Sequence, residues 1–498
     1  MTTLLEPEAL TQARQAPGSS KPAAIAVVDQ TLRDAHQCLW ATRMTTAHML
    51  PVAELMDRVG FQRIEVIAAI QFDVCVRFLK ENPWERVRLM RKRITRTPLS
   101  SFLRSKNIVS FDFVPDDIVG LWAERLVANG VREIGSFDGL NDVDNMLVAL
   151  DVARKLGART IGALSFCLSP VHTDALYVKT AKALIERGNV DAIWIKDAGG
   201  LLTVDRIRTL VPAVRKVVGR TPIELHSHCL TGVAPLVYLE GVKAGADRIH
   251  TSIAPLANGA AQPSLQSMAR NLRGLGYRVD VDDDAVASTG EHFRRIAEQE
   301  NKPLGQVLEY DAFHYEHQVP GGMLSNFRGQ LAELGLSHKF QELLEECARV
   351  RKELGYPIMI TPFAQFVGIQ AVLNVVHQDR YRHVPDEVKK YALGYYGKIL
   401  APVDADVLDR IIANGSPHIA LKPEPLAPAL AKLRRQYPRA TDDERALRIM
   451  FAGTQVDDML SAGPTRTDYV FEKPLVRLVR ELASRKITRV HFSAVKSS

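Results

Sequence analysis

The chain has 498 residues, of which 46% are hydrophobic and 24% are charged, and its formal net charge at pH 7 is +7. This composition is typical of a globular protein with one large domain and room for a smaller one, and it excludes a disordered chain. No apolar run reaches the roughly 18 residues of a membrane span, and basic charge alone does not indicate a nucleic-acid partner.

The first 23 residues predict a disordered leader, because Pro7, Pro17, Gly18 and Pro22 interrupt them and they contain no apolar core. Since they do not resemble a secretory signal, a cytoplasmic location is expected. The five cysteines, at positions 38, 75, 167, 229 and 347, form no CxxC pair. We therefore expect reduced thiols and neither a cysteine zinc site nor disulfide bonds.

Short runs rich in apolar and β-branched residues predict eight strands, at 24–29, 64–67, 99–103, 133–137, 160–166, 192–197, 223–228 and 248–253. Amphipathic stretches between them predict helices, at 45–59, 116–128, 141–156, 173–187, 204–218 and 233–244. Alternating strands and helices indicate parallel βα units, because parallel strands need a crossover connection. Eight such units in about 250 residues predict an α/β fold, a (β/α)8 TIM barrel over residues 24–275. A doubly wound sheet is the alternative, although the first βα connection lacks a GxGxxG motif.

Helical periodicity dominates beyond residue 275, at 327–353, 365–376 and 386–393, after a segment that ends in a Pro320-Gly321-Gly322 turn. We expect residues 276–460 to form a mostly α-helical C-terminal extension that packs on the barrel mouth. Residues 461–498 form a basic tail, in which eight Lys or Arg against three acids after Gly463 give a charge of +5. A solvated tail and a docking segment for an acidic partner both remain open.

Charged residues at the ends of the expected strands mark the candidate site, because a barrel builds its active site at its C-terminal strand ends. They are Asp34, Arg104, Lys196, Asp197, His226 and His228. Alternate residues of a strand share a face, so the two imidazoles of His226-Ser227-His228 project together into the barrel mouth. With the Asp34 carboxylate they form a candidate metal site, and two hydrogen-bonded core histidines are the alternative.

Lys196 allows two interpretations. Burial beside a metal ion lowers the pKa of an amine, and a neutral lysine reacts with CO2 to give a carbamate, which is a carboxylate-like metal ligand. Alternatively, Lys196 forms an ion pair with Asp197 or Asp34.

A series of motifs runs in unbroken order from about residue 25 to 410. It begins with DQTLRDAHQCL at 29–39 and ATR at 41–43, and continues with RFL at 77–79, PWER at 83–86 and FDGLND at 137–142. IKD at 195–197, HSH at 226–228, QPS at 262–264, HQVPGGMLSN at 317–326, TP at 361–362 and GYYG at 394–397 follow. The series resembles the carboxyltransferase domains of pyruvate carboxylase, oxaloacetate decarboxylase α-subunits and transcarboxylase.

The resemblance implies a biotin-dependent carboxyltransferase that moves a carboxyl group between carboxybiotin and a small 2-oxo acid of the pyruvate or oxaloacetate type. Asp34, His226, His228 and a carboxylated Lys196 then match the ligands of a divalent metal, which is zinc, manganese or cobalt in the family. Gln37 and Arg104 match substrate-binding residues, the arginine binding the 2-oxo acid carboxylate. Thr361 matches a catalytic threonine that relays a proton between biotin and the enol form of the substrate.

The chain contains neither a Met-Lys-Met biotin attachment motif nor an ATP-grasp region. The resemblance therefore implies that biotin is supplied on a separate carrier protein, with biotin carboxyl carrier and biotin carboxylase subunits as partners, and a homo-oligomer is expected. One alternative is a metal-dependent aldol-type lyase or synthase of the same barrel superfamily, and another is a non-catalytic scaffold subunit of a carboxylase complex.

Several positions depart from the family pattern. Residues 68–71 replace a Gly-Gly-Ala-Thr run, Gly135 and Ser136 stand where an arginine is common, and Ser105 and Lys106 follow Arg104. Cys229 after the histidine pair is interpreted as a small packing residue. Because the metal-binding residues are intact while the substrate wall differs, we expect carboxyl transfer to be kept, with an acceptor that need not be pyruvate.

Overall fold

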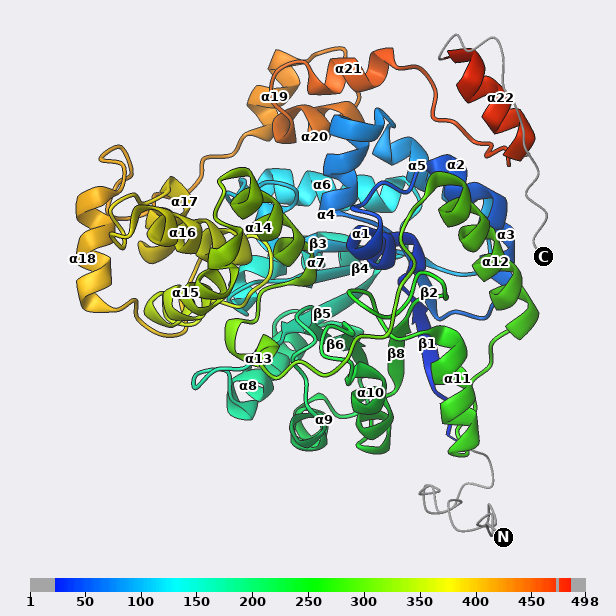
Figure 1. Ribbon diagram of the computed structural model, residues 1–498, viewed down its shortest axis with the longest axis horizontal. Helices are drawn as coiled ribbons and strands as arrows, with labels where there is room; N and C mark the ends of the chain where they lie inside the picture. The colour runs from blue at the N-terminus through cyan, green and yellow to red at the C-terminus, as the bar shows by residue number, and fades with distance from the viewer. Residues whose placement is uncertain (1–22, 472–473, 485–498) are drawn as a thin grey trace, which may run out of the picture.

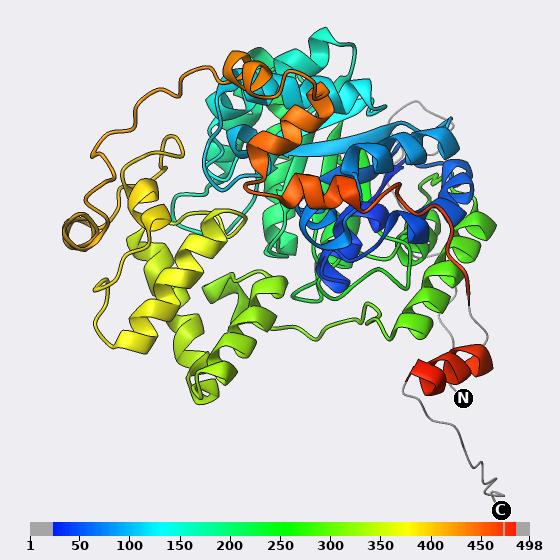
Figure 2. The same cartoon turned by 90° about the horizontal axis from the view of Figure 1, so that it is seen from above.

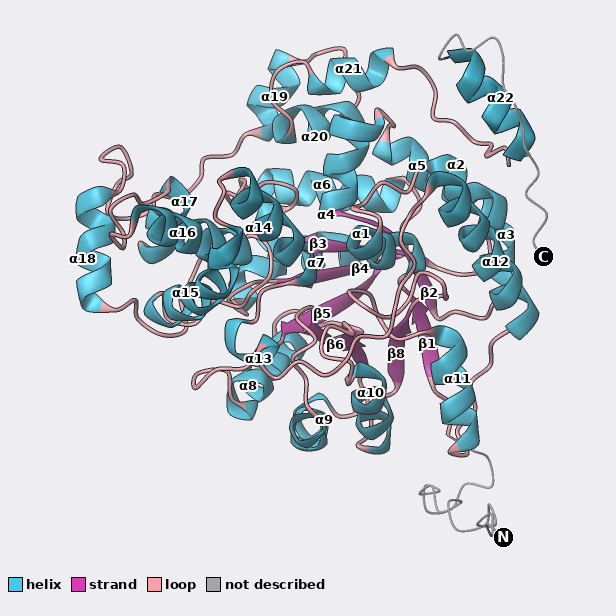
Figure 3. Ribbon diagram, in the orientation of Figure 1, coloured by secondary structure: helices cyan, strands magenta, loops and turns pink. Residues whose placement is uncertain are grey.

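The computed structural model describes residues 23–471 and 474–484, with a closed barrel of eight parallel strands at its centre (Figure 1; Figure 3). The strands are β1 (Ala26–Asp29), β2 (Arg63–Ala68), β3 (Leu99–Arg104), β4 (Glu133–Phe137), β5 (Arg159–Ser165), β6 (Ala192–Asp197), β7 (Ile223–Ser227) and β8 (Arg248–Thr251). Each strand pairs with the next along the chain, and β1 pairs with β8, with Asp29 opposite Thr251. The predicted (β/α)8 barrel is confirmed. The doubly wound alternative is wrong, because such a sheet is open and reverses its strand order, whereas these strands run in sequential order and the sheet closes through the β1–β8 pair.

Helices that follow the strands surround the barrel (Figure 3). They are α1 (His36–Leu39), α2 (Thr46–Met49), α3 (Ala53–Arg58), α4 (Ala69–Val74), α5 (Pro83–Arg93), α6 (Asp116–Ala128), α7 (Val143–Lys155), α8 (Asp174–Glu186), α9 (Val204–Val218), α10 (Ala234–Lys243), α11 (Leu265–Gly274) and α12 (Asp283–Glu300). Their apolar faces and the strands share one hydrophobic core. The single helix expected at 45–59 is wrong. A 3-10 turn (Leu50–Val52) interrupts it, because Pro51 has no amide hydrogen to continue the α-helical pattern.

The next helices form a lobe beside the barrel (Figure 1; Figure 2). They are α13 (His314–His317), α14 (Gly321–Glu333), α15 (Phe340–Glu353), α16 (Phe363–His377), α17 (Asp386–Ala392) and α18 (Ala405–Asn414), and they enclose a second hydrophobic core. The single helix expected at 327–353 is wrong, because the chain turns at Gly335 with φ +70°. The expected turn at 320–322 is also wrong. Pro320 precedes the first residue of α14, where its fixed φ suits the start of a helix.

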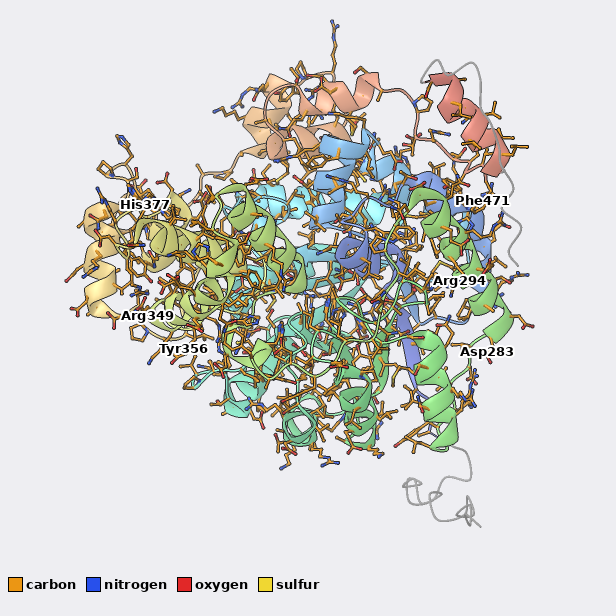
Figure 4. All side chains as sticks on the ribbon, viewed as in Figure 1. Asp283, Arg294, Arg349, Tyr356, His377 and Phe471 are labelled. Carbon is orange, nitrogen blue, oxygen red and sulfur yellow. The ribbon has the colours of Figure 1, made fainter. Side chains whose placement is uncertain are left out.

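The chain then returns to the outside of the barrel through α19 (Leu430–Gln436), α20 (Asp442–Met450) and α21 (Gln455–Ser461). Leu447, Phe451 and Met459 pack in the barrel core, and Asp443 forms an ion pair of 2.7 Å with Arg125 on α6. Phe471 lies beside α12, in contact with Arg295 (Figure 4). The last helix, α22 (Pro474–Ser484), exposes apolar side chains, Leu475 by 68%.

The domain limits expected at 275 and 460 stay predictions. Of the expected leader, residues 1–23, only residue 23 lies in the described range. The expected basic tail is described only in part. Within the described ranges, no helix combines the length and apolarity needed to cross a bilayer.

Polar contacts hold the lobe against the start of α7 and the loops that follow β4 and β5. Asn145 donates to the carbonyl of Tyr396 (3.2 Å), and the backbone amide of Lys398 donates to Asp142 (3.1 Å). Gln318 donates to the carbonyl of Leu168 (2.8 Å). Because these loops lie at the C-terminal strand ends, the lobe borders the barrel mouth.

We predict that Gly135→Ala destabilises the barrel. A Cβ atom on Gly135 would lie 1.8 Å from the Phe102 ring, which Trp194 holds edge-on at 4.0 Å between ring centroids. Overpacking of this kind lowers the free energy of unfolding by about 1–3 kcal/mol, to be measured as a fall in Tm.

Gly120→Ala on α6 is the matched control. Its Cβ would meet Val152 at 3.5 Å, an ordinary contact, and alanine favours a helix over glycine by about 1 kcal/mol. An unchanged Tm in Gly135→Ala would contradict the prediction.

Candidate functional site

Three side chains meet at the C-terminal end of the barrel. The Oδ2 atom of Asp34 lies 3.2 Å from Nε2 of His226 and 3.2 Å from Nε2 of His228, and the two Nε2 atoms are 3.1 Å apart. All three residues are at least 95% buried. The structure therefore brings together the carboxylate and the two imidazoles that the sequence pattern proposed as ligands.

Asp34 is held by the turn that follows β1. This π-helical turn (Thr31–Ala35) folds back on the Gln30 carbonyl, which accepts the backbone amides of Arg33 and Asp34. Arg33 forms an ion pair of 2.8 Å with Oδ1, the Asp34 oxygen that faces away from the histidines. Burial opposes ionisation, but Arg33 and His228 hold the pKa of Asp34 well below its usual range.

The two histidines differ in their surroundings. His228 donates from Nδ1 to the carbonyl of Ala260 at 2.6 Å, which leaves its Nε2 facing Asp34. Burial opposes a charge on His228, but Asp34 raises its pKa to about 10. Burial and the nearby Lys196 charge lower the pKa of His226 well below its usual range.

This donor set fits a divalent metal ion. Zinc binds histidine nitrogen and carboxylate oxygen at about 2.0–2.2 Å in tetrahedral geometry, so its ligand atoms lie about 3.3–3.6 Å apart. The three atoms of the site are 3.1–3.2 Å apart, within a few tenths of an ångström of this spacing. Gln262, on the loop after β8, points its amide at the same atoms and donates to Asp34 Oδ2 at 2.8 Å. Its oxygen accepts from Ser252 at 3.0 Å. A bound ion would therefore compete with the Gln262 amide for the same lone pairs.

Lys196 lies beside the histidines. It is paired with His226 in the register of β6 and β7, and its Nζ lies 5.0 Å from the Trp194 ring and 5.4 Å from the Phe137 ring. No ion pair of Lys196 with Asp197 or Asp34 is found among the residues that the structure describes. Asp197 instead accepts the backbone amides of Leu201 and Leu202. Burial lowers the pKa of Lys196, which favours the neutral amine that carbamate formation requires.

Arg104 ends β3 and is 93% buried. Its Nη2 donates to the carbonyls of Val109 (2.7 Å) and Ser110 (2.9 Å), while its Nε has no hydrogen-bond partner within the described ranges. Burial lowers the pKa of Arg104 to about 10, so it stays cationic at neutral pH. A fixed guanidinium with a free donor is suited to a small carboxylate.

Gln37 and Thr361 are half-buried, and within the described ranges neither forms a side-chain hydrogen bond to the three candidate ligands. Gln37 lies on α1, one helical turn after Asp34. Thr361 precedes α16 of the lobe, and Gln365 donates to its hydroxyl at 3.2 Å. Phe363 packs so closely on Gly139 that a Cβ there would lie 2.3 Å from its ring, which fixes Thr361 against the loop after β4.

A network of buried polar residues inside the barrel was not predicted from the sequence. Glu224 binds both Arg63 and Arg248 at 2.8 Å, and His250 at 3.1 Å. Glu133 lies 3.6 Å from Arg63. The spacing of polar residues within two expected strands could have revealed this network. Glu224 precedes His226 by two residues, and Arg248 precedes His250 by two. Polar residues at this spacing share the inward face of a strand.

The positions that depart from the family pattern are integrated into this structure. Gln71 accepts the backbone amide of Ala68 at 3.0 Å and donates to the carbonyl of Arg33 at 2.8 Å, so it supports the turn that carries Asp34. The Phe102 ring occupies the space beside Gly135. Burial raises the pKa of the Cys229 thiol, as expected of a packing residue.

Comparison with known proteins gives consistent matches. A family model described as conserved carboxylase domain matches residues 315–461, and one described as HMGL-like matches residues 142–292. A pyruvate carboxylase subunit from Methanocaldococcus jannaschii is 44% identical over 81% of this chain and 71% of its own length. The 2-oxoglutarate carboxylase large subunit of Hydrogenobacter thermophilus is 34% identical over 81% of this chain and 62% of its own length. The carboxyl transferase domain of Rhizobium etli pyruvate carboxylase, solved with pyruvate and biocytin, has a TM-score of 0.79 at 25% identity, covering 88% of this chain and 78% of that one.

We predict that metal binding by the metal-free protein weakens as the pH falls. Because the pKa of His228 is about 10, this imidazole is protonated below that pH, and an ion must displace the proton to reach Nε2. Between pH 7.5 and 6.5 the Zn²⁺ affinity should fall by about tenfold, one decade for each pH unit per proton released. Chelator competition measures it.

Calorimetry in buffers of different ionisation heat counts the protons released, and His228→Ala should lose both the tight site and its proton. An affinity that does not change over this pH range would contradict the prediction.

Proposed function

The chain belongs to the carboxyltransferase family of the biotin-dependent carboxylases, and from this membership we propose that it transfers a carboxyl group between carboxybiotin and a small 2-oxo acid. The observation that carries the proposal is the buried Asp34, His226 and His228 set, with Lys196 beside it, at the barrel mouth. Two relatives are named for pyruvate and for 2-oxoglutarate, which supports a 2-oxo acid and leaves its side chain open. Family membership supports carboxyl transfer over the aldol-type lyase and the non-catalytic scaffold.

We propose that Asp34, His226, His228 and a carboxylated Lys196 hold a divalent ion of zinc, manganese or cobalt. When bound, such an ion supplies a Lewis acid for the oxygen of the 2-oxo group. The lowered pKa of Lys196 supports its carboxylation. Lys196 is the register partner of His226, and within the described ranges its Nζ forms no ion pair that would prevent the reaction.

Arg104 and Gln37 are proposed to hold the acceptor. The guanidinium is fixed by the carbonyls of Val109 and Ser110, so it binds the substrate carboxylate without first losing side-chain entropy. The Gln37 amide, one helical turn after Asp34, offers both a donor and an acceptor to the substrate.

Thr361 is proposed to move the proton. Its Oγ1 takes a proton from the methyl or methylene carbon of the 2-oxo acid and passes its own proton to the biotin nitrogen from which CO2 has departed. The electron pair left on carbon forms the new bond to CO2. Gln365 donates to Oγ1, which orients the hydroxyl and leaves its hydrogen free to be given away.

Partner subunits follow from the names of the relatives, which are single subunits of larger enzymes. We propose that the partners are a biotin carboxyl carrier protein and a biotin carboxylase, and that the chain forms a homo-oligomer. The exposed apolar side chains of α22 are consistent with a docking role for the tail.

A panel of 2-oxo acids assayed with carboxylated biotin carrier protein tests the function. We expect carboxylation of at least one acid, with carboxylated carrier required and Thr361→Ala much slower than Thr361→Ser, which keeps the hydroxyl. Turnover that is independent of biotin, or no turnover with any 2-oxo acid by metal-loaded protein, would refute it.

We predict that Arg104→Lys raises KM for the 2-oxo acid by about tenfold to a hundredfold, because a lost hydrogen bond to a charged group costs about 1.5–3 kcal/mol. Metal content should be unchanged, since Arg104 touches none of the proposed ligands in the described structure. Lys106→Ala is the control on the same loop, because the one ion pair of Lys106 among the described residues is with Asp116, at 2.7 Å. Wild-type kinetics in Arg104→Lys would show that another group binds the carboxylate.

A further inference from the structure

His250, on β8, lies directly behind the candidate metal ligand His226, with 3.2 Å between their Nδ1 atoms. We propose that Glu224 and His250 are positioning residues, which fix the tautomer of His226 so that its Nε2 lone pair always faces the metal site. The proposal rests on the metal site proposed above and adds two residues that contact none of the reacting groups.

A row of side-chain contacts runs from Glu224 through His250 and Gln30 to Arg33. Its first member, Glu224, is a carboxylate, which can only accept hydrogen bonds. Arg63 and Arg248 both donate to Glu224, so this buried side chain remains ionised. Nε2 of His250 lies 3.1 Å from the second oxygen of Glu224. Nε2 of His250 also lies 3.3 Å from Nη2 of Arg63, which can only donate. Because that Nη2 already donates to the same Glu224 oxygen, and this oxygen is the nearer neighbour of Nε2, we assign the hydrogen to Nε2 of His250, which donates it to Glu224.

The last member of this row, Arg33, is a guanidinium, which can only donate hydrogen bonds. Nη2 of Arg33 donates to the side-chain oxygen of Gln30 at 2.9 Å, which turns the Gln30 amide nitrogen the other way. That nitrogen lies 2.7 Å from Glu65 and 3.1 Å from Nδ1 of His250. Both of its hydrogens are then donated, and Nδ1 of His250 is an acceptor.

The state of His226 follows from these two ends. If Nδ1 of His226 also carried a lone pair, two lone pairs would face each other across 3.2 Å in a site closed to water. Nδ1 of His226 therefore carries the hydrogen and shares the lone pair of His250 with Gln30. Its Nε2 is left without a hydrogen, which is the form that binds a metal ion.

The same chain of contacts reaches a second ligand. Arg33, which orients Gln30, also pairs with Oδ1 of Asp34 at 2.8 Å. Trp194 packs on both rings, 5.0 Å from His226 and 4.6 Å from His250 between centroids, and prevents them from turning. The network thus holds Asp34 and His226 as one unit before any ion arrives.

The test is the Zn²⁺ affinity of the full-length protein, measured by chelator competition in bicarbonate buffer. His250→Leu fills the space without an acceptor and should weaken binding by about tenfold to a hundredfold, the usual effect of losing such a partner. His250→Asn keeps an amide oxygen near the Nδ1 position and should stay much closer to wild type. Equal losses in both variants would show that only the shape of His250 matters, and would overturn the proposal.

Glu224→Gln and Glu133→Gln form a matched pair, because both carboxylates lie near Arg63 and only Glu224 touches His250. We expect weaker Zn²⁺ binding in Glu224→Gln alone, with the Tm of each metal-free variant reporting its fold. Wild-type affinity in His250→Leu would refute the positioning role. Absence of tight binding in the wild type itself would instead refute the metal site.

Discussion

The buried carboxylate of Asp34 is the charge on which the barrel mouth depends. Removing a carboxylate from water is costly unless the protein supplies matching charges and hydrogen bonds. Here one oxygen is paired with Arg33, and the other faces His226, His228 and the Gln262 amide. Each of these groups needs hydrogen-bond partners of its own. The buried charge of Asp34 therefore requires a network of polar side chains inside the barrel. The site is consequently assembled by the fold and does not wait for a ligand to organise it.

The barrel and the lobe contribute different kinds of group to the proposed site. The barrel provides fixed charges on the ends of its strands and on the turn that follows β1, where backbone hydrogen bonds restrain the side chains. The lobe has its own hydrophobic core and carries Thr361 just before α16, next to Phe363, which packs on the loop after β4. The two parts are joined through backbone carbonyls, as between Asn145 and Tyr396, and through the close approach of Phe363 to Gly139. Such a joint allows Thr361, the proposed proton carrier, to be positioned without disturbing the charged groups of the barrel.

Much of the fold could be read from the sequence because its signals are local. The limits of β4, β6, α6 and α9 coincide with the expected ones, since apolar periodicity and flanking turn residues determine them. The histidine pair was found for the same reason, as alternate residues of a strand share a face. Glu224, His250 and Gln262 were missed as site residues because their partners lie up to 228 residues away, as for Gln262 and Asp34. Only the register of the closed barrel brings such residues together.

Because the chain returns to the barrel after the lobe, cleavage of the peptide chain between α18 and α19 would have a particular outcome. Residues 420–428 link α18 to α19, contain no helix or strand, and are exposed. On the far side of this link, Leu447 and Phe451 are buried in the barrel core, and Asp443 is bonded to Arg125 and Asn129. The lobe, on the near side, is bound separately to the loops at the barrel mouth. A protease that cut the link would therefore produce two fragments that remain assembled, and the break would be visible under denaturing conditions only.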